Sequence, residues 1–249
     1  MAAPLDAMEA GTPGHVYELP PELTLRHLSS GRYARMGVIG DGSCFYHSVC
    51  SILDIDAYRS KSTADQKTIA SDFRCKFNTS LSRAQFNNLS KGTDTGKTFE
   101  ATLDALCESR VWADEVMIKL ASRVLNMNLV FIDLGEEKLY CGVHGDETLQ
   151  RHKQAAQTPV QTRKQMQTQT QTTQTSEIRG GNNDTVPMQP TAVIVWVNRV
   201  HFEPLVRIDS VDATGAVRVT RVFEPSKSEA DKNLVQALMS SYLAQCPNV

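Results

Sequence analysis

The first half of the chain carries apolar residues at helical spacing. From Phe45 onward, apolar side chains recur at positions 45, 49, 52 and 53, which lie on one face of an α-helix. A second helix is predicted over residues 99–106. Asp114 is placed to cap a third helix, whose inner side carries Val116, Met117, Leu120, Val124 and Leu125. Residues 60–98 are polar with scattered aromatics, which predicts short helices and loops.

The second half carries continuous apolar runs that are typical of buried strands. The strongest run covers 192–197 (AVIVWV), and a shorter one covers 129–133. Residues 139–143 and 217–222 predict two weaker strands, and 201–205 continues the extended pattern after a short turn. The later part of the chain therefore supplies most of the predicted sheet.

The final segment predicts one more helix. Ser228 and Asp231 form a capping-box-like start, and one stripe then carries Leu234, Val235, Leu238, Met239, Tyr242 and Leu243. The order along the chain is therefore helices first, several strands next and a helix last. Because strands and helices do not alternate strictly, this order predicts the α+β class rather than a doubly wound sheet.

Composition divides the chain into segments. Residues 1–30 begin with a stretch rich in Ala, Gly and Pro and predict a mobile leader. Residues 31–207 predict one folded domain, and residues 208–249 predict a C-terminal strand and an amphipathic helix. Inside the domain, residues 154–190 contain QMQTQTQTTQTS, which has almost no apolar side chain to bury, so we expect a flexible insertion there.

Charge and composition exclude several functions. The 249 residues include 26 Lys and Arg against 28 Asp and Glu, so there is no electrostatic case for binding nucleic acid or an anionic membrane surface. No Gly-rich phosphate loop is present. The start lacks the pattern of a secretion signal, and the longest apolar run is too short to span a bilayer. We therefore expect a soluble, intracellular protein of the cytoplasm or nucleus.

Cys44 differs from the other cysteines in its position. The six cysteines, at 44, 50, 75, 107, 141 and 246, form no CxxC pair, and the simplest interpretation of each is a free, inert thiol. Cys44, however, follows the turn-forming pair Asp41-Gly42 and opens a predicted helix. The partial positive charge at a helix N-terminus favours a thiolate. Backbone N–H groups around Gly42 and Ser43 are candidates for holding an oxyanion.

Among the six histidines, His201 is the best candidate to activate Cys44. It follows the most hydrophobic strand, and a rigid strand positions a general base better than a loop does. The imidazole needs a third group to fix its tautomer. Glu203 shares one face of an extended strand with His201, and Asn198 and Asp41 are the other candidates.

Cys44, His47 and Cys50 also have a three-residue spacing that occurs among metal ligands. A structural zinc site needs four ligands, usually from two such pairs, and no second pair is present. We therefore predict neither a metal nor a cofactor. His47 is interpreted instead as a polar residue on the helix surface, which points along the helix rather than over its tip.

Two blocks of the sequence resemble a known family. Residues 41–49, DGSCFYHSV, resemble the catalytic block of the ovarian-tumour (OTU) family of cysteine proteases, whose pattern is Asp-Gly-x-Cys, two apolar or aromatic residues, a variable residue and a small one. Residues 195–202, VWVNRVHF, resemble the family's second block, a strand that ends in His and an aromatic residue. Trp112 is similar to the start of the family's Trp-Gly break, with Ala113 replacing Gly. The resemblance covers roughly 36–205 and extends to OTU-like proteins of large DNA viruses.

The resemblance implies a papain-like α+β OTU fold, with a small central β-sheet flanked by helices, over residues 31–207. It implies that Cys44 is the nucleophile, that His201 is the general base, and that Asp41 belongs to the catalytic set. Glu203 stands where the family often has Asp or Asn.

The implied activity is that of a cysteine-type deubiquitinase. Such an enzyme hydrolyses isopeptide bonds to ubiquitin or a ubiquitin-like modifier, with those conjugates as its partners and without a cofactor. One alternative is a catalytically weak OTU-fold module that binds ubiquitin or another protein without cleavage. Another is a scaffold in which the Gln/Thr-rich tract is the working part.

Overall fold

The structure is a computed structural model of the chain. It describes residues 10–19, 28, 31–91, 96–108, 110–133, 138–142, 189–198 and 200–245. The chain divides into two compact units, one made of Met1–His144 with Gln189–Val249 and the other of Gly145–Met188. The second unit lies outside the described residues. The predicted insertion at 154–190 therefore lies outside them too, except for residues 189 and 190.

A seven-stranded mixed sheet forms the centre of the first unit. Its strands are β1 (Val16–Glu18), β2 (Tyr33–Met36), β3 (Asn128–Asp133), β4 (Lys138–Gly142), β5 (Thr191–Val197), β6 (His201–Val211) and β7 (Val217–Thr220). Their order is β1-β2-β6-β5-β3-β4, with β7 paired to β6. β3 and β5 run parallel, and the other described pairs are antiparallel.

Most of the helices form one block of sequence between β2 and β3. The helices are α1 (Cys44–Leu53), α2 (Thr63–Ser80), α3 (Arg83–Leu89), α4 (Phe99–Cys107), α5 (Glu115–Leu125) and α8 (Glu229–Gln245), with a short 3-10 segment, η2 (Ile55–Ser60), after α1. The predicted α+β class, with a central sheet flanked by helices, is confirmed. Within the described part of the chain, no helix combines the length and the apolar character that crossing a membrane requires.

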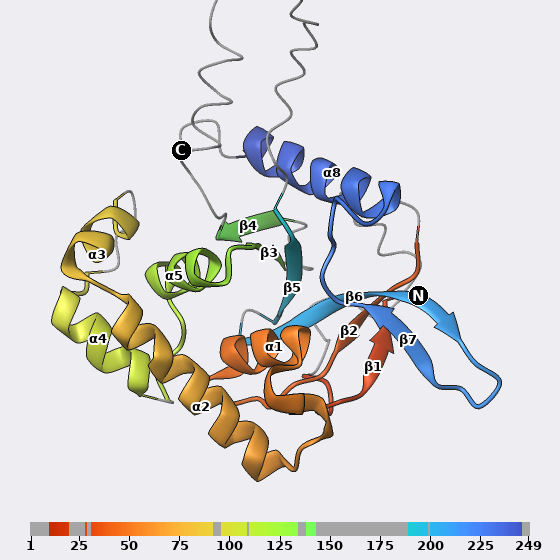
Figure 1. Ribbon diagram of the computed structural model, residues 1–249, viewed down its shortest axis with the longest axis horizontal. Helices are drawn as coiled ribbons and strands as arrows, with labels where there is room; N and C mark the ends of the chain where they lie inside the picture. Colours follow the sequence, from red (N-terminus) through yellow and green to blue (C-terminus); the bar gives the residue numbers. More distant parts are fainter. Residues whose placement is uncertain are drawn as a thin grey trace, which may run out of the picture. The chain divides into compact units, whose positions relative to one another are not determined.

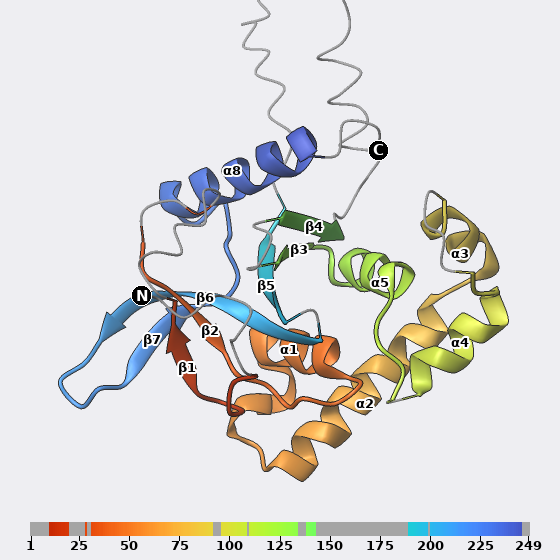
Figure 2. The same ribbon diagram turned by 180° about the vertical axis from the view of Figure 1, so that it is seen from behind.

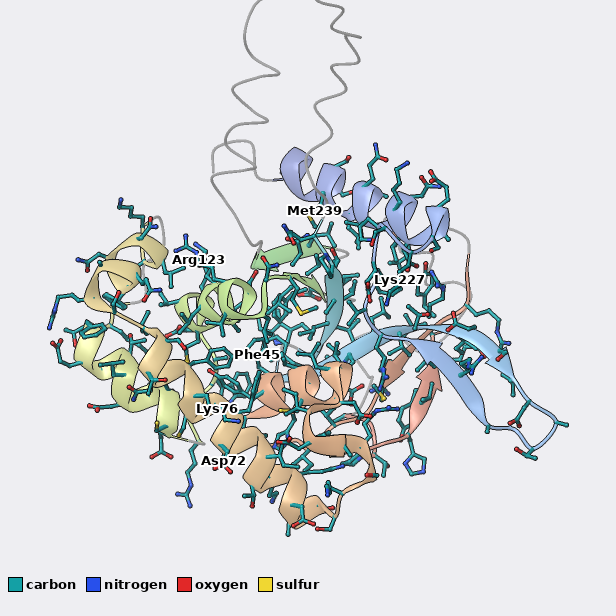
Figure 3. All side chains as sticks on the ribbon, in the orientation of Figure 1. Phe45, Asp72, Lys76, Arg123, Lys227 and Met239 are labelled. Atoms are coloured by element: carbon teal, nitrogen blue, oxygen red, sulfur yellow. The ribbon has the colours of Figure 1, made fainter. Side chains whose placement is uncertain are left out.

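Helices cover both faces of the sheet. In the two opposite views, α1 lies on one side of β5 and α8 lies on the other (Figures 1 and 2). Phe45 of α1 lies in the middle of the first unit, between this helix and the strands (Figure 3). Its ring centroid is 6.0 Å from that of Phe131 and 6.4 Å from that of Phe202. Aromatic pairs of this kind contribute about 0.5–1.5 kcal/mol each beyond their burial, so the cluster fixes α1 against β3 and β6.

The predicted caps are present at two helix starts. The Asp114 carboxylate accepts a hydrogen bond from Met117 N–H (3.0 Å) at the start of α5, and Ser228 Oγ accepts one from Asp231 N–H (3.0 Å) at the start of α8. The buried stripe of α5 is the predicted one except at Val124, which is 48% exposed. The stripe of α8 buries Leu234, Val235 and Leu238, whereas the side chains of Tyr242 and Leu243 lie outside the described residues.

The prediction of short helices and loops over 60–98 is wrong in its first half. α2 is a single helix of 18 residues, with Ser62 as its N-cap. Its buried side chains include Ala70, Phe73 and Phe77, whose spacing of three and four places them on one face. Long polar stretches between these positions hide that periodicity in the sequence.

The predicted segment boundaries at both ends also need correction. Residues 1–30 are not all a mobile leader, because β1 pairs with β2 inside the sheet. At the other end, β6 crosses the predicted boundary after residue 207, and β7 and α8 belong to the same compact unit as the rest of the sheet. The β1–β2 pairing has a direct consequence for the site described next.

Candidate active site

The turn before α1 places Cys44 at the helix N-terminus. Cys44 is the first residue of α1, and Ser43 is the N-cap residue. The Asp41 carboxylate accepts a hydrogen bond from Ser43 N–H (2.8 Å), and the Asp41 carbonyl accepts one from Cys44 N–H (3.1 Å). Ser43 N–H, predicted as an oxyanion donor, is therefore already used. The N–H groups of Asp41 and Gly42 donate to no acceptor among the described residues, so these are the free donors beside the thiol.

A buried arginine of α2 ties this turn to α4. Arg74 is fully buried and donates to Ser43 Oγ (3.2 Å), to the Gly42 carbonyl (3.4 Å) and to the Leu106 carbonyl (2.8 Å). Its guanidinium lies over the ring of Tyr46, 4.9 Å from the centroid. The turn that carries the thiol is thus held by a cation from a helix that is distant in sequence.

His201 reaches Cys44 from the strand side. It is the first residue of β6, and it pairs with Val197 at the end of β5, across a turn in which Asn198 adopts a left-handed φ of 48°. A Cβ at Gly40, in the turn before Cys44, would lie 3.7 Å from Cε1 of this ring, and the Cys44 thiol is close enough to raise the pKa of His201. Nε2 of His201 faces Glu203, whereas Nδ1 lies on the side of Gly40, in the turn that leads to Cys44. The structure therefore brings together the two residues that the sequence pairs.

The charge state of His201 is set by its two neighbours. Burial alone lowers the pKa of this imidazole, because a charged group loses hydration there. The neighbouring Cys44 and Glu203 side chains outweigh burial and raise the pKa of His201 from 6.5 to about 9. An imidazolium at neutral pH is the partner that a thiolate nucleophile requires.

Glu203 is the third group beside His201, and it is completely buried. Its Oε1 accepts a hydrogen bond from Gly11 N–H (2.5 Å), and its Oε2 accepts one from Arg35 (2.7 Å). Oε1 also lies 3.5 Å from Nε2 of His201, which is a charge contact rather than a hydrogen bond. Nε2 is buried and has no hydrogen-bond partner among the described residues. Although burial raises the pKa of Glu203, the contacts with His201, Gly11 and Arg35 lower it overall.

Asp41 contacts a different histidine. Its Oδ2 lies 3.2 Å from Nε2 of His47, and Nδ1 of His47 lies 2.7 Å from the hydroxyl oxygen of Tyr58. His47 is fully buried, so its interpretation as a polar residue on the helix surface is wrong. Of the candidates for orienting His201, the structure places Glu203 beside the ring and Asp41 on the turn of the thiol, whereas Asn198 is exposed in the β5–β6 turn.

A metal site is not formed by these residues. In the described residues, no group of three or more His, Cys, Asp or Glu side chains is placed to hold a metal ion. His47, one member of the Cys44, His47 and Cys50 spacing, has both ring nitrogens in contact with Asp41 and Tyr58. The described side chains of the candidate site are the thiol of Cys44, the imidazole of His201 and the carboxylate of Glu203.

Solved structures give the comparison with known proteins. The chain is similar to OTU domains. One is an OTU domain in complex with ubiquitin (15% identity, covering 87% of this chain and 89% of that one, TM-score 0.46). Others are the Hazara virus OTU bound to ubiquitin (13%, 78% and 97%, 0.37) and the viral OTU domain protease from Dera Ghazi Khan virus (12%, 80% and 99%, 0.38). No protein-family model and no curated protein matches the chain. An origin in a large DNA virus stays a prediction.

Sequence reasoning missed the residues that surround the predicted pair. Arg35 and Gly11 hold Glu203, whereas His47 contacts Asp41 and is itself held by Tyr58. The start of the chain is rich in Ala, Gly and Pro, a composition that predicts a leader rather than a strand. A weak signal was present nonetheless, since a buried glutamate beside the histidine requires a cation, and Arg35 lies in a short segment that leads to the Asp41 block.

Proposed function

We propose that this protein is a cysteine-type hydrolase that removes ubiquitin or a ubiquitin-like modifier from conjugates. The observation that carries the proposal is the position of the His201 ring beside the turn that presents Cys44 at the N-terminus of α1, with the carboxylate of Glu203 next to Nε2. The resemblance of the 41–49 and 195–202 blocks to OTU proteases supplies the substrate class. Cys44, His201 and Glu203 are the proposed catalytic residues, and Asp41 acts by shaping the turn.

The proposed reaction proceeds through a thioester. His201 holds the proton of Cys44, and the thiolate attacks the carbonyl carbon of the modifier's C-terminal glycine. The N–H groups of Gly42 and Asp41 stabilise the oxyanion, because they have no other described acceptor. The C–N bond then breaks, and His201 gives its proton to the leaving lysine amine. Water then attacks the thioester carbonyl, and His201 takes a proton from that water. The C–S bond breaks, which releases the modifier with a free C-terminal carboxylate and regenerates Cys44.

The test is labelling with a ubiquitin derivative that carries an electrophile at its C-terminus. Wild type is expected to form a covalent adduct, and Cys44→Ala is expected to form none. Cys107→Ala is the matched control, because Cys107 is an exposed thiol outside the site and its loss leaves specific labelling intact. Labelling that persists in Cys44→Ala contradicts the proposal.

Cleavage is tested separately, with ubiquitin dimers of each linkage. Release of monomer by wild type, but not by Cys44→Ala, supports hydrolysis. Binding without release favours the module that binds without cleavage. The observation that favours this second function is the 3.5 Å separation between Nε2 of His201 and Glu203, which is too long for a hydrogen bond that would orient the imidazole.

A further inference from the structure

We propose that Arg35 and the segment 11–18 are positioning elements of the site, which keep Glu203 ionised and directed at His201. This inference rests on the proposed function, because it assigns a role to residues around the same catalytic group. It assigns that role to a part of the chain whose sequence has the composition of a leader.

The first support is the way that Arg35 is held. Arg35 lies on β2, is 7% exposed and donates to Oε2 of Glu203 at 2.7 Å. Its guanidinium lies 4.8 Å from the ring centroid of Tyr17 on β1, and the Tyr17 hydroxyl accepts a hydrogen bond from Thr12 N–H (2.8 Å). β1 therefore fixes the cation, and the cation fixes the carboxylate.

The second support is a close approach of two glycines. A Cβ at Gly37 would lie 2.3 Å from the Thr12 carbonyl oxygen, and a Cβ at Gly11 would lie 2.7 Å from the Tyr17 ring and 3.1 Å from Oε1 of Glu203. Gly37 also accepts from Gly14 N–H (2.9 Å) and donates to the His15 carbonyl (2.9 Å). Because both positions lack a side chain, the segment packs closely enough for Gly11 N–H to reach Glu203.

The third support is electrostatic. A carboxylate with no exposure keeps its charge only if cations and N–H groups replace the lost hydration. The groups around Glu203 are Arg35 from β2, Gly11 N–H from the segment before β1, and His201 from β6 itself. Removing Arg35 takes one positive charge from this buried set, so Glu203 binds a proton at a higher pH and no longer supports the imidazolium.

The experiment compares pH profiles of thiol reactivity. Alkylation of Cys44 by iodoacetamide, followed by mass spectrometry of its peptide, is measured from pH 4 to 10. In Arg35→Met, the acidic limb is expected to move up by about one pH unit, which is about a tenfold loss of rate below that limb. Arg35→Lys keeps the charge, so its acidic limb is expected to lie close to that of wild type.

Two further variants separate positioning from stability. Gly37→Ala displaces the segment without changing charge, and a smaller shift in the same direction is expected. Arg32→Met breaks the exposed ion pair with Glu18 in the same pair of strands, and no shift is expected. If Arg35→Met does not fold, the acidic limb of Gly37→Ala is the deciding measurement. A lower melting temperature with an unmoved acidic limb, in whichever of the two variants folds, overturns the inference.

The readout also distinguishes this inference from the proposed function. Alkylation requires no ubiquitin, so a shift in Arg35→Met with no ubiquitin adduct in wild type retains the inference and rejects the function. An adduct in wild type, together with an unmoved acidic limb in the variants, retains the proposed function and rejects the inference.

Discussion

Two buried histidines lie near the same thiol, and they differ in almost every respect that matters for chemistry. His47 is 3.2 Å from the Asp41 carboxylate, and His201 is 3.5 Å from that of Glu203. Burial lowers the pKa of His47 although Asp41 acts against it, whereas the pKa of His201 is raised to about 9. A carboxylate within 4 Å therefore does not by itself make an imidazole a base.

The difference lies in the second neighbour of each ring. Nδ1 of His47 faces the neutral hydroxyl of Tyr58, and its carboxylate partner Asp41 has a side chain that is 33% exposed. His201 has an ionisable thiol on one side and a fully buried carboxylate on the other. Because water screens an exposed charge, Asp41 raises the pKa of His47 less than Glu203 raises the pKa of His201.

The largest expected effect comes from removing each imidazole in turn. His201→Gln is expected to lower kcat/KM on a ubiquitin substrate by about 10³-fold, since general base catalysis contributes about 10²–10⁴-fold. His47→Gln is expected to lose about tenfold or less, because it acts only through Asp41 and the turn. Steady-state kinetics of both variants measure this, and equal losses would contradict the assignment of the base.

A smaller effect is expected from neutralising each carboxylate. Glu203→Gln keeps the shape but removes the charge, so the pKa of His201 should fall by about one unit or more. Asp41→Asn should lower the pKa of His47 further and leave that of His201 nearly unchanged. NMR titration of the histidine rings, assigned with His201→Gln and His47→Gln, measures both values. A fall of the His201 value in Asp41→Asn alone would reverse the two roles.

The smallest expected effect is on stability against pH. The folded pKa of His47 lies below its usual 6.5, so the unfolded chain binds the proton first and stability falls as pH drops below that value. His201 has the opposite sign: its contribution is full below 6.5 and is lost as pH rises through about 9. Chemical denaturation of His47→Gln between pH 4.5 and 7 should show a shallower decline than wild type. An equally steep decline would assign the acid sensitivity to other groups.

The sequence is sufficient to predict the class of fold and to select Cys44 and His201 as candidates, because each depends on a local pattern. Cys44 follows a turn and opens a helix, and His201 follows the most apolar strand. What surrounds them depends on contacts across the chain. Glu203 is bound by Arg35 and Gly11, which are 168 and 192 positions away, and no local periodicity encodes such a pairing. His47 was misjudged for the same reason, since η2 covers it with Tyr58.

The pairing of β3 with both β4 and β5 has a consequence for protein engineering. Leu129 is paired with Gly142 on one side and with Ala192 on the other, so these two points lie two strand spacings apart, which is about 10 Å. The polypeptide leaves the sheet at one point and re-enters at the other. A guest protein with adjacent ends, such as a fluorescent reporter, fits between these two points without stretching the sheet.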